Sequence, residues 1–166
     1  MSILILMLIS LANKHNYNQY LVLIDTDSET ISNKINCTNQ IINNHYNHAD
    51  SSLAYFQQPQ KVLHFVVQDS SLQIKEEYLQ CALLQLFENH LGSVIAIPLN
   101  SLKGFSQNIL DHINMISEKY DILFYIAQHP LNESYPQSNA KIIYVKREKQ
   151  FSSSELAVLF AIKTIL

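Results

Sequence analysis

The chain has 166 residues, of which 48% are hydrophobic and 15% charged, and its formal net charge is −3. This composition excludes a disordered tail and favours one folded domain spanning residues 1–166. The slight acidic excess gives no support for nucleic-acid binding, or for attraction to a membrane surface by bulk charge.

The first twelve residues are almost wholly apolar. A transmembrane helix needs about 20 apolar residues, so this run is too short to span a bilayer. It fits either a buried helix or strand, or a signal segment of an exported domain that is cleaved after Ala12, although no Lys or Arg precedes it. We favour the folded element, because the next strand follows within a short loop, and so expect a cytoplasmic protein.

Residues 20–27, with the sequence YLVLIDTD, form the segment around which the other elements are arranged. The run is apolar on both faces, which is typical of a central strand in a covered parallel sheet. Asp25 and Asp27 stand at its carboxyl end. Open α/β sheets bind their ligands at that edge, so the two acids are candidate site residues.

Residues 28–60 are rich in Asn, Gln, Ser and His, and we interpret them as a variable polar insertion. Asp27 or Ser28 could cap a short helix that continues through Ile31 and Ile35. His45, His48 and Asp50 provide too few ligands for a metal site, so an exposed polar loop is favoured there.

Strands and helices alternate regularly after residue 60. Strands are predicted at residues 62–67, 93–98, 121–127 and 141–145. Helices are predicted from Asp69 or Ser70 to a left-handed cap at Gly92, along the stripe from Phe105 to Ile116, and from a Ser152–Glu155 capping box onward. This order predicts a three-layer α/β/α domain with a mostly parallel sheet of about five strands.

Four stretches occur in an order that resembles a known family. Residues 8–12 with 20–27 are similar to a helix and the strand "VLLIDxD", and 93–99 to a strand ending "vlpaG". Residues 119–127 are similar to "yDyviiDtPP", and 141–156 to a strand and the start of a helix. The series resembles the MinD/ParA superfamily of deviant P-loop ATPases, which includes bacterial tyrosine kinases and polysaccharide-assembly proteins. The resemblance implies a P-loop NTPase-like fold.

Departures from the family pattern bear directly on function. The glycine- and lysine-rich phosphate loop should precede residue 8, and no glycine-rich loop is present, since Gly92 and Gly104 are the only glycines. The family's second magnesium-associated Asp falls at Ile126 or Ala127. Asp25 and Asp27 are therefore vestigial nucleotide-site positions, and we expect no catalytic residue, no bound metal and no cofactor.

The resemblance implies a non-catalytic pseudo-ATPase that recruits or regulates a partner in bacterial localisation, division, secretion or polysaccharide assembly. The partner would be a full-length ATPase or a membrane assembly component, with homodimerisation and peripheral membrane association both left open. Asp25, Asp27 and His129 are the predicted interface residues, because His129 follows a strand at the same edge of the sheet. Capping of a following helix is the alternative role of the two acids.

A receiver-like or other small α/β phosphotransfer domain is the alternative function, since an acidic pair at a strand end can bind magnesium and accept phosphate. Among the remaining residues, His64 lies in an apolar strand and is predicted to be a core histidine with satisfied ring nitrogens. Cys81 is predicted to be a small buried apolar residue of a helix, and neither cysteine is assigned to a disulfide.

Overall fold

The computed structural model describes residues 21–38, 48–54, 61–68, 74–89, 91–99, 105–131 and 139–166. The apolar segment 1–12 and the cleavage site proposed after Ala12 lie outside these ranges. The strands are β1 (Leu21–Asp25), β2 (Lys34–Asn36), β3 (Val62–Val66), β4 (Val94–Ile97), β5 (Leu123–Ala127) and β6 (Ile142–Val145). The helices are α2 (His48–Ser52), α3 (Glu76–Asn89), α4 (Gln107–Tyr120) and α5 (Ser153–Ile165).

The strands form one six-stranded sheet in the order β2-β3-β1-β4-β5-β6, and every pairing is parallel. The α/β class and the parallel sheet predicted from the sequence are thereby confirmed, with six strands rather than about five. The additional strand is β2, which lies within the stretch 28–60 that was interpreted as a polar insertion. Its Ile35 belongs to this strand and not to the short helix predicted after Asp27 and Ser28.

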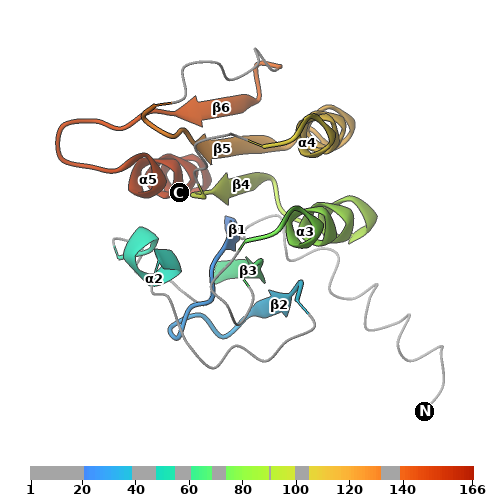
Figure 1. The fold of residues 1–166 in the computed structure, drawn as a ribbon, viewed down its shortest axis with the longest axis horizontal. Helices are drawn as coiled ribbons and strands as arrows, with labels where there is room; N and C mark the ends of the chain where they lie inside the picture. The colour runs from blue at the N-terminus through green and yellow to red at the C-terminus, as the bar shows by residue number, and fades with distance from the viewer. Residues whose placement is uncertain are drawn as a thin grey trace.

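Helices cover both faces of the sheet, as Figure 1 shows, with α3 and α4 on one side and α2 and α5 on the other. The core under α3 and α4 is built from alternate strand residues such as Val22, Ile24 and Phe65. The core under α2 and α5 contains the intervening residues Leu21 and Leu23. This alternation is that of a strand buried on both faces, and it gives the predicted three-layer arrangement.

Helix ends follow the predicted capping chemistry in most places. The Ser152–Glu155 capping box is present at the start of α5, and Gly92 has a φ of 74°. The start of α3 was predicted wrongly, because the helix begins at Glu76 and Ile74 instead bridges Gln68. In the part of the chain that is described, no helix has the length and apolar character needed to cross a membrane.

Candidate functional site

Asp25 ends the central strand β1 and points toward α2. Because strand side chains alternate, it shares its face with Leu21 and Leu23, which pack in the α2/α5 core. Its side chain has 0% exposure and accepts a hydrogen bond from the Thr26 N–H at 2.7 Å. His48, the first residue of α2, brings Nδ1 to 2.8 and 3.0 Å from the two carboxylate oxygens. Asp25 and His48 therefore form a buried acid–histidine pair.

The pairing changes the protonation of His48. Its hydrogen bond to Asp25 raises the pKa of His48 above the ordinary 6.5, and partial burial opposes the increase. The side chain keeps 27% exposure, so one edge of the ring reaches solvent. His48 therefore supplies positive charge beside Asp25 at pH values where a free histidine is largely neutral.

Asp27 is held by a different set of groups. Lys34 Nζ donates to its Oδ1 at 2.7 Å, and the Ser28 N–H donates to the same oxygen at 2.8 Å. The Asp27 N–H donates to Gln68 Oε1 at 3.3 Å, which ties the β1 loop to the residues after β3. Asp25 and Asp27 do not cap a helix, because the loop after them leads into β2, so the capping interpretation was wrong.

Asp50 organises the loop that follows Asp27. The Ser28 and Thr30 hydroxyls donate to its Oδ1, and the Glu29 N–H donates to Oδ2 at 3.3 Å. Burial raises the pKa of Asp50, but the hydrogen bonds from Ser28, Thr30 and Glu29 outweigh burial and leave the pKa below its ordinary value. The exposed polar loop predicted at His45, His48 and Asp50 is thus wrong for the last two, because His48 and Asp50 are partly buried in α2 and contact the end of β1 and the loop after it, respectively. His45 lies outside the described residues.

His64 and Gln68 are two fully buried side chains whose polar atoms are not all hydrogen-bonded. His64 faces the same side of the sheet as Asp25 and has 0% exposure, and its register partners are Leu23 and Lys34. Neither ring nitrogen of His64 has a hydrogen-bond partner among the described residues, and the same holds for Gln68 Nε2. The predicted core position of His64 is confirmed, but its ring nitrogens are not satisfied by ordinary hydrogen-bond geometry, and only an interaction with the Thr26 backbone contributes to raising its pKa as a hydrogen bond. Burial lowers the pKa of His64, so the ring is neutral at pH 7.

His129 follows β5, two strands away from Asp25 in the sheet order. Its Nδ1 accepts a hydrogen bond from the Leu131 N–H at 3.2 Å, and the side chain is partly exposed. The histidine that contacts Asp25 is instead His48. The two residues are 23 positions apart, and no periodicity in the sequence connected them.

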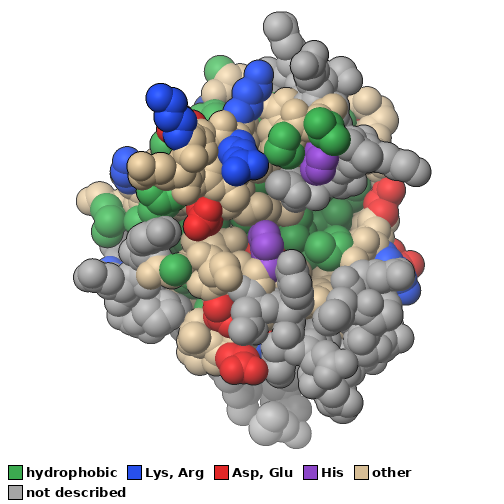
Figure 2. Space-filling model, turned by 60° about the vertical axis from the view of Figure 1, so that its left-hand side comes forward, with side chains coloured by type: hydrophobic (Ala, Val, Ile, Leu, Met, Phe, Trp, Pro, Cys, Tyr) green, Lys and Arg blue, Asp and Glu red, His purple; other side chains and the backbone are tan. Residues whose placement is uncertain are grey.

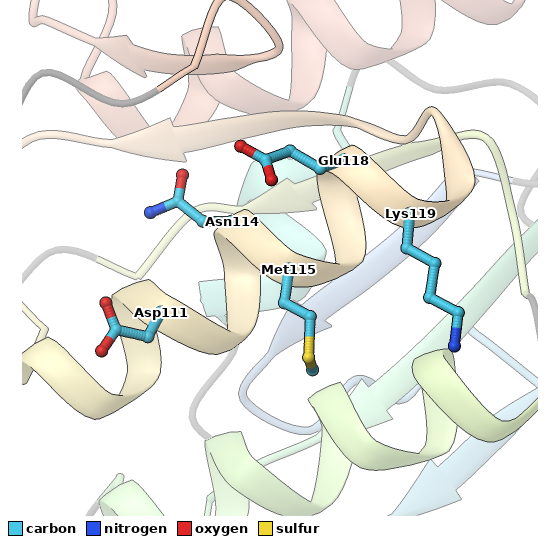
Figure 3. Close-up of a pocket in the computed structure, with 5 residues that line it drawn as sticks. All are labelled: Asp111, Asn114, Met115, Glu118 and Lys119. Atoms are coloured by element: carbon cyan, nitrogen blue, oxygen red, sulfur yellow. The ribbon is translucent and has the colours of Figure 1, made fainter.

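A surface hollow of about 520 Å³ lies elsewhere, on the exposed side of α4. Figure 3 shows that its five labelled residues all come from this one helix and that Met115 and Lys119 point toward α3. This is the face opposite α2, so the hollow does not belong to the Asp25 cluster. Among the described residues, no group of three or more His, Cys, Asp or Glu side chains is arranged to hold a metal ion.

A second hollow of about 580 Å³ lies at the turn before α5 and is lined by residues including Arg147, Lys149 and Phe151. The run Lys146, Arg147, Glu148 and Lys149 is exposed. On the face seen in Figure 2, several basic side chains gather at the upper left, and acidic side chains lie at the centre left and below, near a histidine at the centre. The run 146–149, called the basic turn below, is thus one charged surface that a partner could contact.

No protein-family profile, curated protein or solved structure matches this chain.

Proposed function

We propose that the chain is a non-catalytic interaction module, a pseudo-ATPase relative of the MinD/ParA proteins that recruits or regulates a partner in a bacterial localisation, division, secretion or polysaccharide-assembly system. One observation carries the proposal: the acids of the carboxyl edge are neutralised within the chain. His48 pairs with Asp25 and Lys34 pairs with Asp27. A carboxylate held in this way is a poor ligand for magnesium and a poor acceptor of a phosphoryl group.

The partner-binding surface in this proposal consists of exposed residues around the buried acids. Asp25 and Asp27 are almost fully buried, so they act by fixing the loop and the helix above them. Glu29 and Thr30 are exposed on that loop, and His48 and His129 are partly exposed at the same edge. The partner is a protein, either a full-length ATPase of the same superfamily or a membrane assembly component. The basic turn at Lys146 supports peripheral contact with an acidic surface.

Site-specific photo-crosslinking in the native host tests this surface. A benzophenone-bearing phenylalanine is placed at Glu29, an exposed residue of the carboxyl-edge loop. The same amino acid at exposed Glu118, near the end of α4 and the start of β5, is the matched control at the opposite edge of the sheet. We expect one protein, an ATPase or a membrane assembly component, to crosslink to position 29 and not to position 118. Absence of that product, or equal yield at both positions, would contradict the proposal.

A second function is favoured by one specific observation, the two-oxygen contact between Asp25 and His48. A buried carboxylate that orients a partly exposed histidine is the arrangement of a general base in hydrolysis or phosphotransfer. Turnover of p-nitrophenyl acetate or p-nitrophenyl phosphate by the purified chain, lost in His48→Ala while the fold is retained, would favour this function over the interaction module.

A further inference from the structure

The two cysteines lie on the α3/α4 side of the sheet, one after the edge strand β2 and the other in α3. Cys37 directly follows β2, its N–H donates to the Val66 carbonyl at 3.0 Å, and its side chain packs against the α3/α4 core. Cys81 lies within α3. Both are partly buried free thiols, separated by 44 positions, from 37 to 81, in the sequence.

The helical position of Cys81 places it on a different flank of α3 from the one that contacts α4. Phe87 marks the flank of α3 that faces α4, because its ring contacts Tyr120 at a centroid distance of 5.5 Å. Six residues at 100° each place Cys81 roughly 120° around the helix from Phe87. Figure 1 shows α3 between α4 and the β2 edge, so the flank of α3 away from α4 is the one nearest β2. The side chain of Cys81 contributes to the raised pKa of Cys37, as expected for two neighbouring thiols.

We propose that Cys37 and Cys81 form an intramolecular oxidative modification site, in which a small-molecule disulfide converts the two thiols into a Cys37–Cys81 disulfide that ties strand β2 to helix α3. The proposal is independent of the function proposed above, because this pair lies on the α3/α4 side of the sheet and Asp25 faces the other side. It assigns a role to two residues that the sequence left outside any disulfide.

The exchange proceeds in two balanced steps with glutathione disulfide as the oxidant. The Cys81 thiolate attacks one sulfur of the reagent, the reagent's S–S bond breaks, and the first glutathione thiolate leaves. Cys37 then loses its thiol proton, its thiolate attacks the Cys81 sulfur of the mixed disulfide, the bond between Cys81 and glutathione breaks, and the second glutathione thiolate leaves. The two thiol protons end on the two glutathione molecules, so two cysteines are oxidised and one reagent disulfide is reduced.

The environment of Cys37 makes it the slower of the two nucleophiles, so its attack is placed second, where Cys81 in the mixed disulfide is already beside it. Burial raises the pKa of Cys37 well above its ordinary value, and the hydrogen bond and charge interaction with Cys81 add to the increase. Cys37 therefore stays protonated at neutral pH and is a poor first nucleophile. The oxidation is accordingly expected to be slow at pH 7 and faster at higher pH.

The test treats the reduced full-length chain with glutathione disulfide at pH 8, then blocks remaining thiols with N-ethylmaleimide and measures the intact mass. We expect a monomer that has lost two hydrogen atoms and carries no maleimide, with one proteolytic fragment pair linked through Cys37 and Cys81. The closed loop is expected to raise Tm by about 10 °C.

Two single variants complete the test. Cys81→Ala, at a partly exposed helix position that tolerates alanine, and Cys37→Ser should each accumulate a mixed disulfide with glutathione on the remaining cysteine or retain one maleimide-reactive thiol. In the wild-type chain, two retained thiols, stable mixed disulfides, or a dimer linked through disulfides would each overturn the proposal. If Cys37→Ser does not fold, Cys81→Ala and the wild-type chain alone decide the outcome.

Discussion

His48→Ala is expected to lower the free energy of unfolding at pH 7 by about 3 kcal/mol, because it leaves the fully buried Asp25 carboxylate without its cation. The Thr26 N–H remains as a hydrogen-bond donor to Asp25 but carries no positive charge. Urea-induced unfolding monitored by circular dichroism measures the effect. The expected result distinguishes His48 from an ordinary surface histidine, whose removal changes stability by less than about 0.5 kcal/mol.

Two companion variants establish that charge is the cause. Asp25→Asn combined with His48→Ala removes the unpaired charge and should recover part of the stability lost in His48→Ala alone. His112→Ala is the matched control on α4, where the histidine Nδ1 lies 2.7 Å from the Asn108 carbonyl oxygen in an exposed contact. A double variant less stable than His48→Ala would show that packing, and not the uncompensated Asp25 charge, explains the loss.

His64→Leu is expected to stabilise the protein by about 1–3 kcal/mol, although it changes a fully buried residue. The ring nitrogens of His64 reach no partner at ordinary hydrogen-bond geometry, and burial outweighs the interaction of the ring with the Thr26 backbone. Leucine has nearly the same size and carries no polar atom to desolvate. The same urea experiment measures the change, and a loss of stability would mean that the interaction of His64 with Thr26 is worth more than the cost of burying the ring.

His48 and His64 should both make stability depend on pH. His64 is expected to lower stability below pH 6.5, and the contribution of His48 is expected to be lost above it. The folded pKa of His64 is lowered, so the unfolded chain binds its proton first and stability falls as pH drops below 6.5. The folded pKa of His48 is raised, so its contribution is complete below 6.5 and is lost as pH rises through the folded value. The wild-type chain is therefore expected to be most stable near pH 6.5.

Single variants separate the decline in stability below pH 6.5 from the decline above it. His64→Leu should remove the decline between pH 6.5 and 5, and His48→Ala should remove the decline above 6.5. Chemical unfolding at a series of pH values between 5 and 8 measures both. If the stability of His64→Leu still falls between pH 6.5 and 5 as in the wild-type chain, other groups cause that decline.

Most of the sheet was predictable from the sequence, because its strands are buried on both faces and read as continuous apolar runs. The segments at residues 62–67 and 121–127 became β3 and β5 with ends that differ by only one or two residues. Capping chemistry is equally local, and it located the start of α5 at Ser152 correctly. These features depend on residues that are close together in the sequence, so local patterns are enough to predict them.

The site was not predictable to the same degree, since its contacts join distant positions. The Asp25–His48 contact spans 23 positions and the Asp27–Gln68 contact spans 41. β2 has three residues, and its pattern lies within a polar stretch that gave no strand signal. An edge strand of this length takes its structure from pairing with β3, so its propensity carried little information.

Isothermal titration calorimetry of the purified chain with Mg-ATP tests the central claim most directly. Asp25 and Asp27 are already paired with His48 and Lys34, so we expect no binding heat at micromolar nucleotide and no released phosphate. Micromolar affinity that disappears in a folded Asp25→Asn variant would contradict the account and would make the carboxyl edge of this sheet a working nucleotide site.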